Sequence, residues 1–446
     1  MRLVTSWSLL VSSLSAQAVW TQLYPAVSPS PRNNPSMACF EPTGDVVMLF
    51  GDEPNGLSTQ SWSLQGSTWI AFQSPPQPGY ARGLVYDSVR QRLVVFGGHA
   101  PLSVNDDTWE WNGSQWTNPG PATRPSPRAQ FAMAFDRSRG VTVVFGGVAA
   151  NNGYLADLWE WDGTNWLQRA AATPLGARAY SLAAFDPIHG NVLVHGGLSQ
   201  LPNGATIHND TWAWNGTSWS QYQPPMPPPY DVQGAMVTDL HRGRVILYGG
   251  GAGTLTREWD GANWTIIGPP LPGSRIGHGM AYDTAGRRTV VFGGTALGNF
   301  VQDTWIYRTA LPADVAPFGA GCPGTAGTPA LANTPYVYPW LGDTMTNVAA
   351  PCAANALGAL FVSSFGTMSP LSLNALGLPG CELLVPLDLV ELRPAAAGEV
   401  EWSLAIPSVP ALAAATFRQQ AFVLDPAANP FGLAASNAVT VTLGVR

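Results

Sequence analysis

The chain has 446 residues, 46% of them apolar and 11% charged, which is enough to form more than one hydrophobic core. All 21 basic residues are arginines, which excludes lysine Schiff-base chemistry and a lysine-dependent phosphate loop. The net charge of −7, with no basic run, argues against nucleic-acid and anionic-membrane partners.

Residues 1–18 have the order of a secretory signal peptide. Arg2 precedes an apolar, serine-rich stretch, and Ala16-Gln17-Ala18 follows as a cleavage site. A buried helix is the alternative interpretation. We expect export, with the mature protein secreted or held in the cell envelope, and we expect no membrane span because no later stretch reaches about 20 apolar residues.

The next segment, "AVWTQLYPAVSPSPR" at 18–32, has no strand partner beside it. Trp20 precedes Arg32 by the interval that separates Trp116 from Arg128 and Trp166 from Arg178. The segment therefore resembles one piece of a repeated unit whose other strands lie elsewhere in the chain.

An aromatic residue or histidine followed by glycine recurs every 44 to 53 residues, after an apolar run typical of a buried strand. We expect these motifs to end the second strand of each unit, ten residues after an earlier strand end. The motifs are Phe50-Gly51, Phe96-Gly97, Phe145-Gly146, His195-Gly196, Tyr248-Gly249 and Phe292-Gly293.

Pairs of tryptophans seven residues apart follow the glycine motifs, as in Trp109 and Trp116, with "NGSQ", "DGTN" or "NGTS" between them. Asn-Gly and Asp-Gly between apolar strands are the strongest short hairpin signal, because both turn residues need positive φ. Each unit is therefore predicted to be four antiparallel strands in two hairpins.

The repeated "VVFGG", "DTWEW" and Pro/Arg-containing links resemble the kelch family, over about residues 19 to 310. The resemblance implies a six-bladed β-propeller, which we place at residues 19–311. The sixth unit lacks a fourth strand, since Pro312 stands seven residues after Trp305. We expect residues 19–24 to supply that strand, with Trp20 in the place of Trp116, and so to latch the ring.

Residues 312–335 are rich in Ala, Pro and Gly and are interpreted as a linker to a small β-sandwich at 336–446. This region is similar to a β-rich segment found at the C-terminus of exported bacterial proteins. Of the four cysteines, Cys39 is expected to be a buried free thiol, and one disulfide is expected among Cys322, Cys352 and Cys381, with Cys322–Cys381 the preferred pair.

One face of the predicted propeller carries the loops between second and third strands, which vary in length. Functional groups usually lie on variable loops held by a rigid scaffold, so this face is the binding candidate. The longest loop, "LSQLPNGATIHND" at 198–210, offers Asn203 and His208.

Five further residues are expected near the channel mouth on this face: Arg82, Arg128, Arg178, Arg275 and His278. Arginine forks bind carboxylates in a bidentate manner, so one interpretation is an anion or glycan-carboxylate site. The other is that the arginines bond carbonyls and aspartates of their own units, because ion-pair networks often mimic sites.

We expect an exported, non-catalytic, monomeric propeller that recognises a glycan or protein, with no metal and no cofactor. Kelch-type propellers also include galactose-oxidase-like copper enzymes and sialic-acid mutarotases, so a carbohydrate-active enzyme using the channel mouth is the alternative. A copper site would need clustered imidazole and tyrosine ligands, and few of the six histidines could approach the channel. A purely structural envelope component is a third possibility.

Overall fold

The computed structural model describes residues 18–100, 103–201, 204–228, 232–251, 255–268, 272–309, 313–334, 338–354, 356–363, 370–376, 378–386, 389–409 and 412–445. Within these ranges the regular structure is β-strand apart from one 3-10 turn at Asn374–Leu376, so the predicted all-β class is confirmed. The chain forms two compact units, the propeller unit Ala18–Arg308 and a C-terminal unit from Thr309 onward. The described residues include no helix long and apolar enough to cross a membrane.

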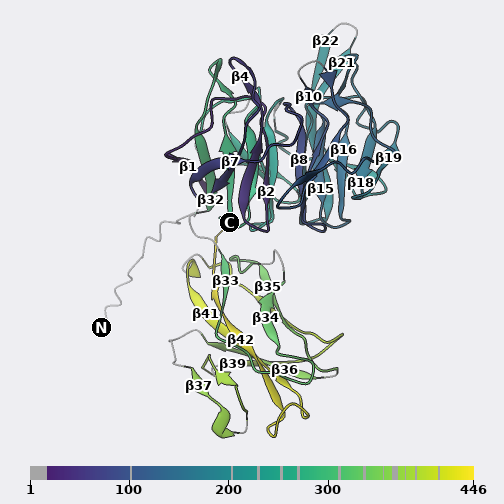
Figure 1. The fold of residues 1–446 in the computed structure, drawn as a ribbon. Coiled ribbons are helices and arrows are strands. Elements are labelled where there is room, and N and C mark those ends of the chain that lie inside the picture. The colour runs from purple at the N-terminus through teal and green to yellow at the C-terminus, as the bar shows by residue number, and fades with distance from the viewer. Residues whose placement is uncertain are drawn as a thin grey trace, which may run out of the picture. The chain divides into compact units, whose positions relative to one another are not determined.

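The propeller unit holds six four-stranded antiparallel sheets among its described residues (Figure 1). They are numbered here in chain order. The first comprises β2 (Ser36–Phe40), β3 (Asp45–Leu49), β6 (Ser61–Gln65) and β7 (Thr68–Phe72); the second β8 (Gly83–Asp87), β9 (Arg92–Phe96), β12 (Thr108–Trp111) and β13 (Trp116–Thr117); the third β15 (Ala132–Asp136), β16 (Val141–Phe145), β18 (Leu158–Trp161) and β19 (Trp166–Ala170).

The last three sheets follow the same order of strands. The fourth comprises β20 (Leu182–Asp186), β21 (Asn191–Leu201), β22 (Gly204–Trp214) and β23 (Trp219–Tyr222); the fifth β24 (Ala235–Asp239), β25 (Arg244–Tyr248), β26 (Thr256–Trp259) and β27 (Trp264–Ile267); the sixth β28 (Gly279–Asp283), β29 (Arg288–Phe292), β32 (Thr304–Thr309) and β1 (Ala18–Leu23).

The hydrophobic core of this unit lies between the sheets. Each first strand contacts the first strands of two other sheets, and these contacts include one between β28 and β2. Six clusters of buried apolar side chains each join two neighbouring sheets. The β-branched and aromatic residues of the repeat thus bury both faces of each sheet, which accounts for the nearly continuous apolar runs of the second strands.

Strand β1 occupies the outer edge of the sixth sheet, beside β32. The Nε1 atom of Trp20 donates to Thr256 Oγ1 of the fifth sheet at 2.7 Å. Trp166 makes the same kind of bond to Thr108, and Trp69 to Thr304, in each case reaching the preceding sheet around the unit. Trp20 therefore has the environment of a fourth-strand tryptophan, although 236 residues separate it from its partner.

In the first sheet, the strand register differs by one residue from the register that the repeat spacing predicted. Phe40 pairs with Asp45, as Asp136 pairs with Val141, so Phe40 is the counterpart of Asp136 and not of Phe135. Phe50 consequently stands where the other sheets have the first glycine, and its φ of 51° is close to the 64° of Gly146. An aromatic residue in the left-handed region is rare, which is why the sequence pattern suggested otherwise.

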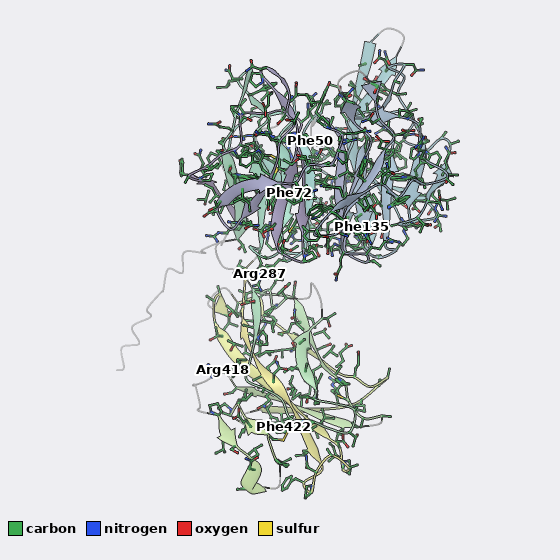
Figure 2. The ribbon with its side chains drawn as sticks, viewed as in Figure 1. Phe50, Phe72, Phe135, Arg287, Arg418 and Phe422 are labelled. Atoms are coloured by element: carbon green, nitrogen blue, oxygen red, sulfur yellow. A yellow bond between two sulfur atoms is a disulfide. The ribbon has the colours of Figure 1, made fainter. Side chains whose placement is uncertain are left out.

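The two ends of the unit differ as expected. Tight turns join first to second strands at one end, where Phe135 lies, and the longer connections from second to third strands are at the other, toward which Phe50 lies (Figure 2). We call the second end the variable-loop face. Small hairpins build three of its connections, and β21 and β22 extend beyond the other strands as one long hairpin (Figure 1). The small hairpins are β4 (Asp52–Glu53) with β5 (Gly56–Leu57), β10 (His99–Ala100) with β11 (Ser103–Val104), and β30 (Thr295–Ala296) with β31 (Asn299–Phe300); β17 (Val148–Ala149) pairs with β14 (Arg128–Ala129).

The C-terminal unit has two main sheets. One is ordered β33 (Asp314–Phe318), β42 (Leu433–Thr442), β41 (Thr416–Leu424), β36 (Leu357–Ser363) and β39 (Leu389–Pro394); the other is β34 (Ala330–Asn333), β35 (Thr344–Ala350) and β40 (Val400–Ala405); a small pair is β37 (Leu371–Ser372) and β38 (Glu382–Leu383). One apolar cluster draws on both main sheets, including Met345 and Trp402 from one and Leu360 and Val441 from the other.

Two of these strands fall inside the segment predicted as a linker. Strand β33 pairs with β42, and β34 pairs with β35. Pro317 belongs to β33, which is an edge strand where proline is tolerated because its missing N–H faces outward. The Pro- and Gly-rich composition of 312–335 therefore marks a sheet edge rather than a spacer.

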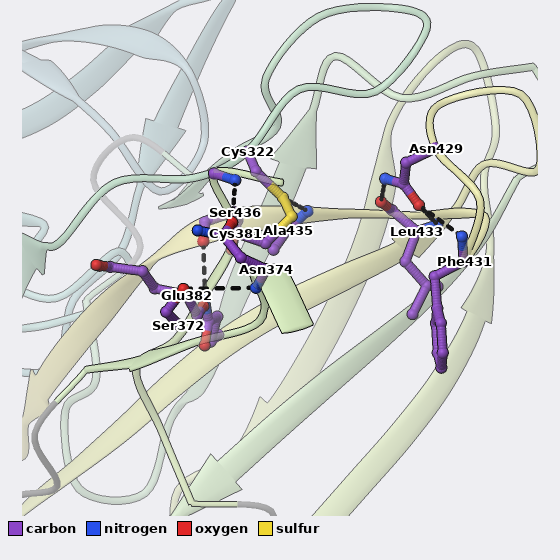
Figure 3. The surroundings of a disulfide bond; sticks show 12 residues. Cys322, Ser372, Asn374, Cys381, Glu382, Asn429, Phe431, Leu433, Ala435 and Ser436 are labelled. Carbon is purple, nitrogen blue, oxygen red and sulfur yellow. Dashed lines mark hydrogen bonds between the residues drawn. A yellow bond between two sulfur atoms is a disulfide. The ribbon is translucent and has the colours of Figure 1, made fainter. Parts of the chain in front are cut away.

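The disulfide of this unit joins Cys322 and Cys381, the pair preferred from the sequence, with Cα atoms 4.9 Å apart (Figure 3). The Cys322 backbone N–H donates to the Ala435 carbonyl at 2.8 Å, which fixes the disulfide against β42. Cys39 and Cys352 are buried free thiols. Burial raises the pKa of Cys39 to about 11, so its thiol is protonated at neutral pH.

Candidate functional site at the channel mouth

A ring of left-handed residues surrounds the mouth of the central channel on the variable-loop face. One such residue lies shortly before each first strand: Asn34, Ala81, Gln130, Tyr180, Gln233 and Gly277, with φ between 50° and 64°. Peptide groups bond from one sheet to the next, for example from Asn34 N–H to Gly277 O at 2.6 Å and from Tyr180 N–H to Gln130 O at 2.8 Å. The mouth thus has a rigid backbone rim.

Two cavities follow one another inward from this rim. The outer one has a volume of about 170 Å³ and is lined by residues that include Asn34, Gln130, Tyr180 and Gln233. The inner one, about 330 Å³, is lined by the first strands of all six sheets. His278 lies on the walls of both cavities, so the two spaces adjoin.

Four buried arginines have one geometry, and we call them the clamp arginines. Each donates from Nη1 to the carbonyl oxygen of the residue 18 positions later, at the end of the second strand. The pairs are Arg32 with Phe50 at 2.9 Å, Arg128 with Gly146 at 3.0 Å, Arg178 with Gly196 at 3.2 Å, and Arg275 with Gly293 at 3.2 Å.

Three of the clamp arginines also form bidentate ion pairs. Arg128 reaches the two carboxylate oxygens of Asp157 at 2.7 and 2.8 Å, and a neighbouring tryptophan donates to the same carboxylate. Burial alone would raise the pKa of Asp157, but the hydrogen bonds and charge of Arg128 hold it below the usual value. The equivalent pairs are Arg178 with Asp210 and Arg275 with Asp303. These guanidinium groups fasten the variable loops to the sheets.

Arg32 was missed by the sequence analysis because of the register error in the first sheet. When Phe50 is aligned with Gly146, Arg32 stands 18 residues before Phe50, as Arg128 stands 18 residues before Gly146. Arg32 is fully buried and lies 3.1 Å from a carboxylate oxygen of Glu53.

Arg82 donates to the carbonyl that a clamp arginine binds in other sheets, but it stands three residues later in the repeat. Its Nε donates to Gly97 O at 2.7 Å and its Nη1 to Gln77 O at 2.8 Å. Gly79 stands where four of the other sheets have a clamp arginine, and a Cβ there would lie 3.1 Å from the Arg82 side chain. Arg82 thus runs along the sheet, 6% exposed, and its burial lowers the pKa to about 10.

His278 lies in the channel wall. It is 5% exposed, and its ring is 5.1 Å from that of Tyr248. Neither ring nitrogen bonds another side chain, and the backbone of Tyr248 is near enough to the ring to favour its protonated form. Burial, followed by the charge of Arg275, lowers the pKa of His278 to about 3, so the imidazole is neutral at physiological pH. It is a buried polar group beside both cavities.

The two residues predicted on the long loop have different outcomes. His208 lies in β22, where its Nε2 is 2.9 Å from Ser199 Oγ across the hairpin. Burial lowers its pKa. Asn203 lies outside the described residues. The hairpin therefore carries His208 as part of its own cross-strand bonding.

A cluster of tyrosines at the mouth was also missed. Burial, and then the nearby hydroxyls of Tyr154 and Tyr80, raise the pKa of Tyr180. Tyr80 stacks on His99 with ring centroids 4.7 Å apart and planes inclined by 21°. Tyr180 thus lines the outer cavity, and the other two tyrosines lie near enough for their hydroxyls to act on it. The available signal was the polar or aromatic residue just before each first strand, as in "GYARG" and "RAYSL".

At the opposite end of the inner cavity, charged groups meet. Glu41 of the first sheet and Arg137 near the third sheet form an ion pair, and both line the cavity. Burial raises the pKa of Glu41, and burial with the charge of Glu41 raises that of Tyr86 to about 12. No three His, Cys, Asp or Glu side chains within the described ranges gather as a metal site would require.

Comparison with known proteins bears on the fold alone. No family model matches the chain, and no curated protein matches it either. Among solved structures, the chain is similar to one titled "Structure of YjhT", with 17% sequence identity and a TM-score of 0.50, over 63% of this chain and 95% of that chain. That neighbour is a kelch-type propeller, and the likeness supports a β-propeller here.

Proposed function

We propose that this chain is an exported binding protein that recognises a glycan through the channel mouth on its variable-loop face. The observation that carries the proposal is Tyr180 on the wall of a cavity lined by amide-bearing residues, with Tyr154 and Tyr80 near enough to influence its pKa. Binding sites for small molecules combine aromatic surface with a few convergent polar groups. Tyrosine supplies both an apolar ring face and a hydroxyl.

The scaffold suits recognition. The rim residues are fixed by backbone bonds between sheets, and the clamp arginines hold the loops around them. A preorganised site loses little entropy when it binds. Variable loops on such a scaffold are where binding residues concentrate.

Export is the second part of the proposal. The order of charge, apolar core and cleavage site in residues 1–18 supports it, and so does the Cys322–Cys381 disulfide, since such bonds persist in oxidising compartments. Of the predicted signal peptide, only Ala18 lies among the described residues, where it begins β1.

A glycan array probed with the chain from residue 19 onward tests the proposal, with the bound glycans analysed by mass. We expect binding without product, and we expect Tyr180→Asn to weaken it about fivefold, since an aromatic contact contributes about 1 kcal/mol. Asparagine tolerates the left-handed backbone of this position, so the rim is preserved.

Tyr24→Ala is the matched control, because Tyr24 is 83% exposed and its hydroxyl bonds only within its own segment. Absence of binding to any glycan would contradict the proposal. Formation of a product would favour the carbohydrate-active enzyme instead.

A further inference from the structure

The charges around the mouth limit which glycans can bind there. Arginine is the usual partner of an acidic sugar, since its fork binds a carboxylate through two hydrogen bonds. The bidentate forks of Arg128, Arg178 and Arg275 are already occupied by Asp157, Asp210 and Asp303. Arg82 lines both cavities and keeps its charge, but its Nε and Nη1 are on carbonyl oxygens, its Nη2 is buried, and the negative charge of Asp107 acts on it.

The histidines on this face supply no positive charge either. The pKa of His278 is about 3, and burial lowers the pKa of both His99 and His208 below the ordinary value. Asp52 lies close enough to Tyr80 for its negative charge to raise the pKa of the tyrosine. An acidic ligand would therefore find no bidentate fork free among these arginines and no charged histidine.

The polar groups that remain are suited to hydroxyl groups. The outer cavity is lined by the amide-bearing residues Asn34, Gln130 and Gln233 and by the hydroxyl-bearing residues Ser181 and Tyr180. His278 lines both cavities, and its neutral imidazole has one donor and one acceptor nitrogen. Sugar hydroxyls can donate and accept, so they satisfy such groups, and the tyrosines can contact the ring face.

The sizes of the two cavities limit how much of a ligand can enter the channel. The outer cavity, at about 170 Å³, is smaller than the roughly 300–1,000 Å³ of pockets that enclose drug-sized molecules. The inner cavity below it is lined by apolar residues that include Met37, Met133 and Met280, and the Glu41–Arg137 pair lies at its far end. One sugar ring fits the outer space, with the rest of the chain directed out.

We infer that the mouth binds an uncharged sugar ring end-on, as a free sugar or as the terminal residue of a longer glycan, in contact with Tyr180 and His278. This inference rests on the proposed function and specifies its ligand class. It replaces the anionic ligand that the arginine spacing suggested with a neutral one.

Titration calorimetry on the chain from residue 19 onward tests the inference. The probes are glucose, galactose, mannose and N-acetylglucosamine, β-linked tetrasaccharides ending in each of them, and tetrasaccharides that end in the corresponding uronic acids. We expect the best neutral probe to bind at least about tenfold more tightly than its uronic-acid match. Equal affinity of monosaccharide and tetrasaccharide would identify a free sugar as sufficient, and a preference for the tetrasaccharide would identify a glycan terminus; either result supports end-on binding.

Two results would overturn the inference while leaving glycan binding intact. One is tighter binding of the acidic probes. The other is binding that survives methylation of the terminal ring, which would mean that the interior of the glycan is recognised. Failure of every probe and of the array would remove the proposed function as well.

The variant His278→Phe separates binding from folding. Phe131 occupies the equivalent position before the first strand of the third sheet, so phenylalanine is compatible with this place in the repeat. We expect about a tenfold loss of affinity for the neutral probe with an unchanged melting temperature. If the variant binds as tightly as the parent protein, His278 has only a structural role and the inferred contact is wrong.

Discussion

Buried arginines illustrate how one residue type serves the scaffold rather than a ligand. Arg128 is fully buried and satisfied by Gly146 O and the Asp157 carboxylate. In the fifth unit of the repeat, the sequence has Asp231 in the place of the arginine and Leu255 in the place of the aspartate. Within the buried Arg128–Asp157 pair, each charge therefore compensates the other.

We predict that Arg128→Met lowers the free energy of unfolding by about 3–5 kcal/mol, because it leaves the Asp157 carboxylate without its buried partner. The double variant Arg128→Met/Asp157→Leu should recover most of the loss, since neither charge then remains. Urea denaturation of the two variants checks this. Equal stability of the single and double variants would show that the pair is not coupled.

Two buried histidines make the stability of the propeller unit depend on pH. Burial lowers the pKa of His195 to about 4 and that of His278 to about 3, both below the 6.5 of an unfolded chain. Because the unfolded state binds the extra proton, their contribution is present above pH 6.5 and is lost as pH falls toward the folded values. Each histidine should lower the free energy of unfolding by about 2 kcal/mol at pH 5 relative to pH 7.

We predict that His195→Phe reduces this pH dependence by about 2 kcal/mol, while leaving stability at pH 7 similar. Phe96, Phe145 and Phe292 occupy the equivalent place, so the ring fits between the sheets. Urea denaturation at pH 7 and pH 5 measures the difference. An unchanged pH dependence would mean that His195 is protonated in the folded state.

At the scale of elements, β1 is the strand whose partner lies farthest along the chain. Its Trp20 ring lies 4.9 Å from that of Tyr248 and 5.0 Å from that of Tyr307, and its Nε1 bonds Thr256. These contacts join the start of the propeller unit to its last two sheets. They also cover the outer edge of β32, which would otherwise be exposed.

We predict that Trp20→Ala lowers the free energy of unfolding by about 3 kcal/mol, at the lower end for a buried tryptophan because this one is partly exposed. Val19→Ala in the same strand is the control, since Val19 is 46% exposed. Thermal and urea unfolding of both variants give the comparison. If the two variants are equally stable, β1 does not latch the ring.

For the whole molecule, the two units have separate sources of stability. The propeller unit depends on six apolar clusters between its sheets, whereas the C-terminal unit combines a sandwich core with a disulfide that spans 59 residues. A cross-link of this length removes unfolded-state entropy worth about 4 kcal/mol.

We predict that Cys322→Ser/Cys381→Ser lowers the melting temperature of a transition assigned to the C-terminal unit. The transition of the propeller unit should stay in place, because its described cysteine, Cys39, is a free thiol. Scanning calorimetry of the full chain resolves the two. A shift of both transitions by the same amount would contradict independent unfolding.

The sequence by itself determined the all-β class, the four-stranded repeat and the two-unit organisation, because these depend on local patterns. Asn-Gly turns, alternating apolar runs and tryptophans at fixed spacing are short-range signals. The position of Trp20 was also predictable, since the repeat lacks a strand at one end and has a surplus one at the other.

Only the tertiary structure decided the register of the first sheet, the partners of the arginines and the composition of the mouth. The left-handed backbone of Phe50 is imposed by pairing across the sheet, not by its own preference. Likewise, the arginine spacing is the same whether a guanidinium faces a ligand or a buried carboxylate. Tyr80, Tyr154 and Tyr180 come together because three sheets meet around one axis, and a linear sequence does not record that proximity.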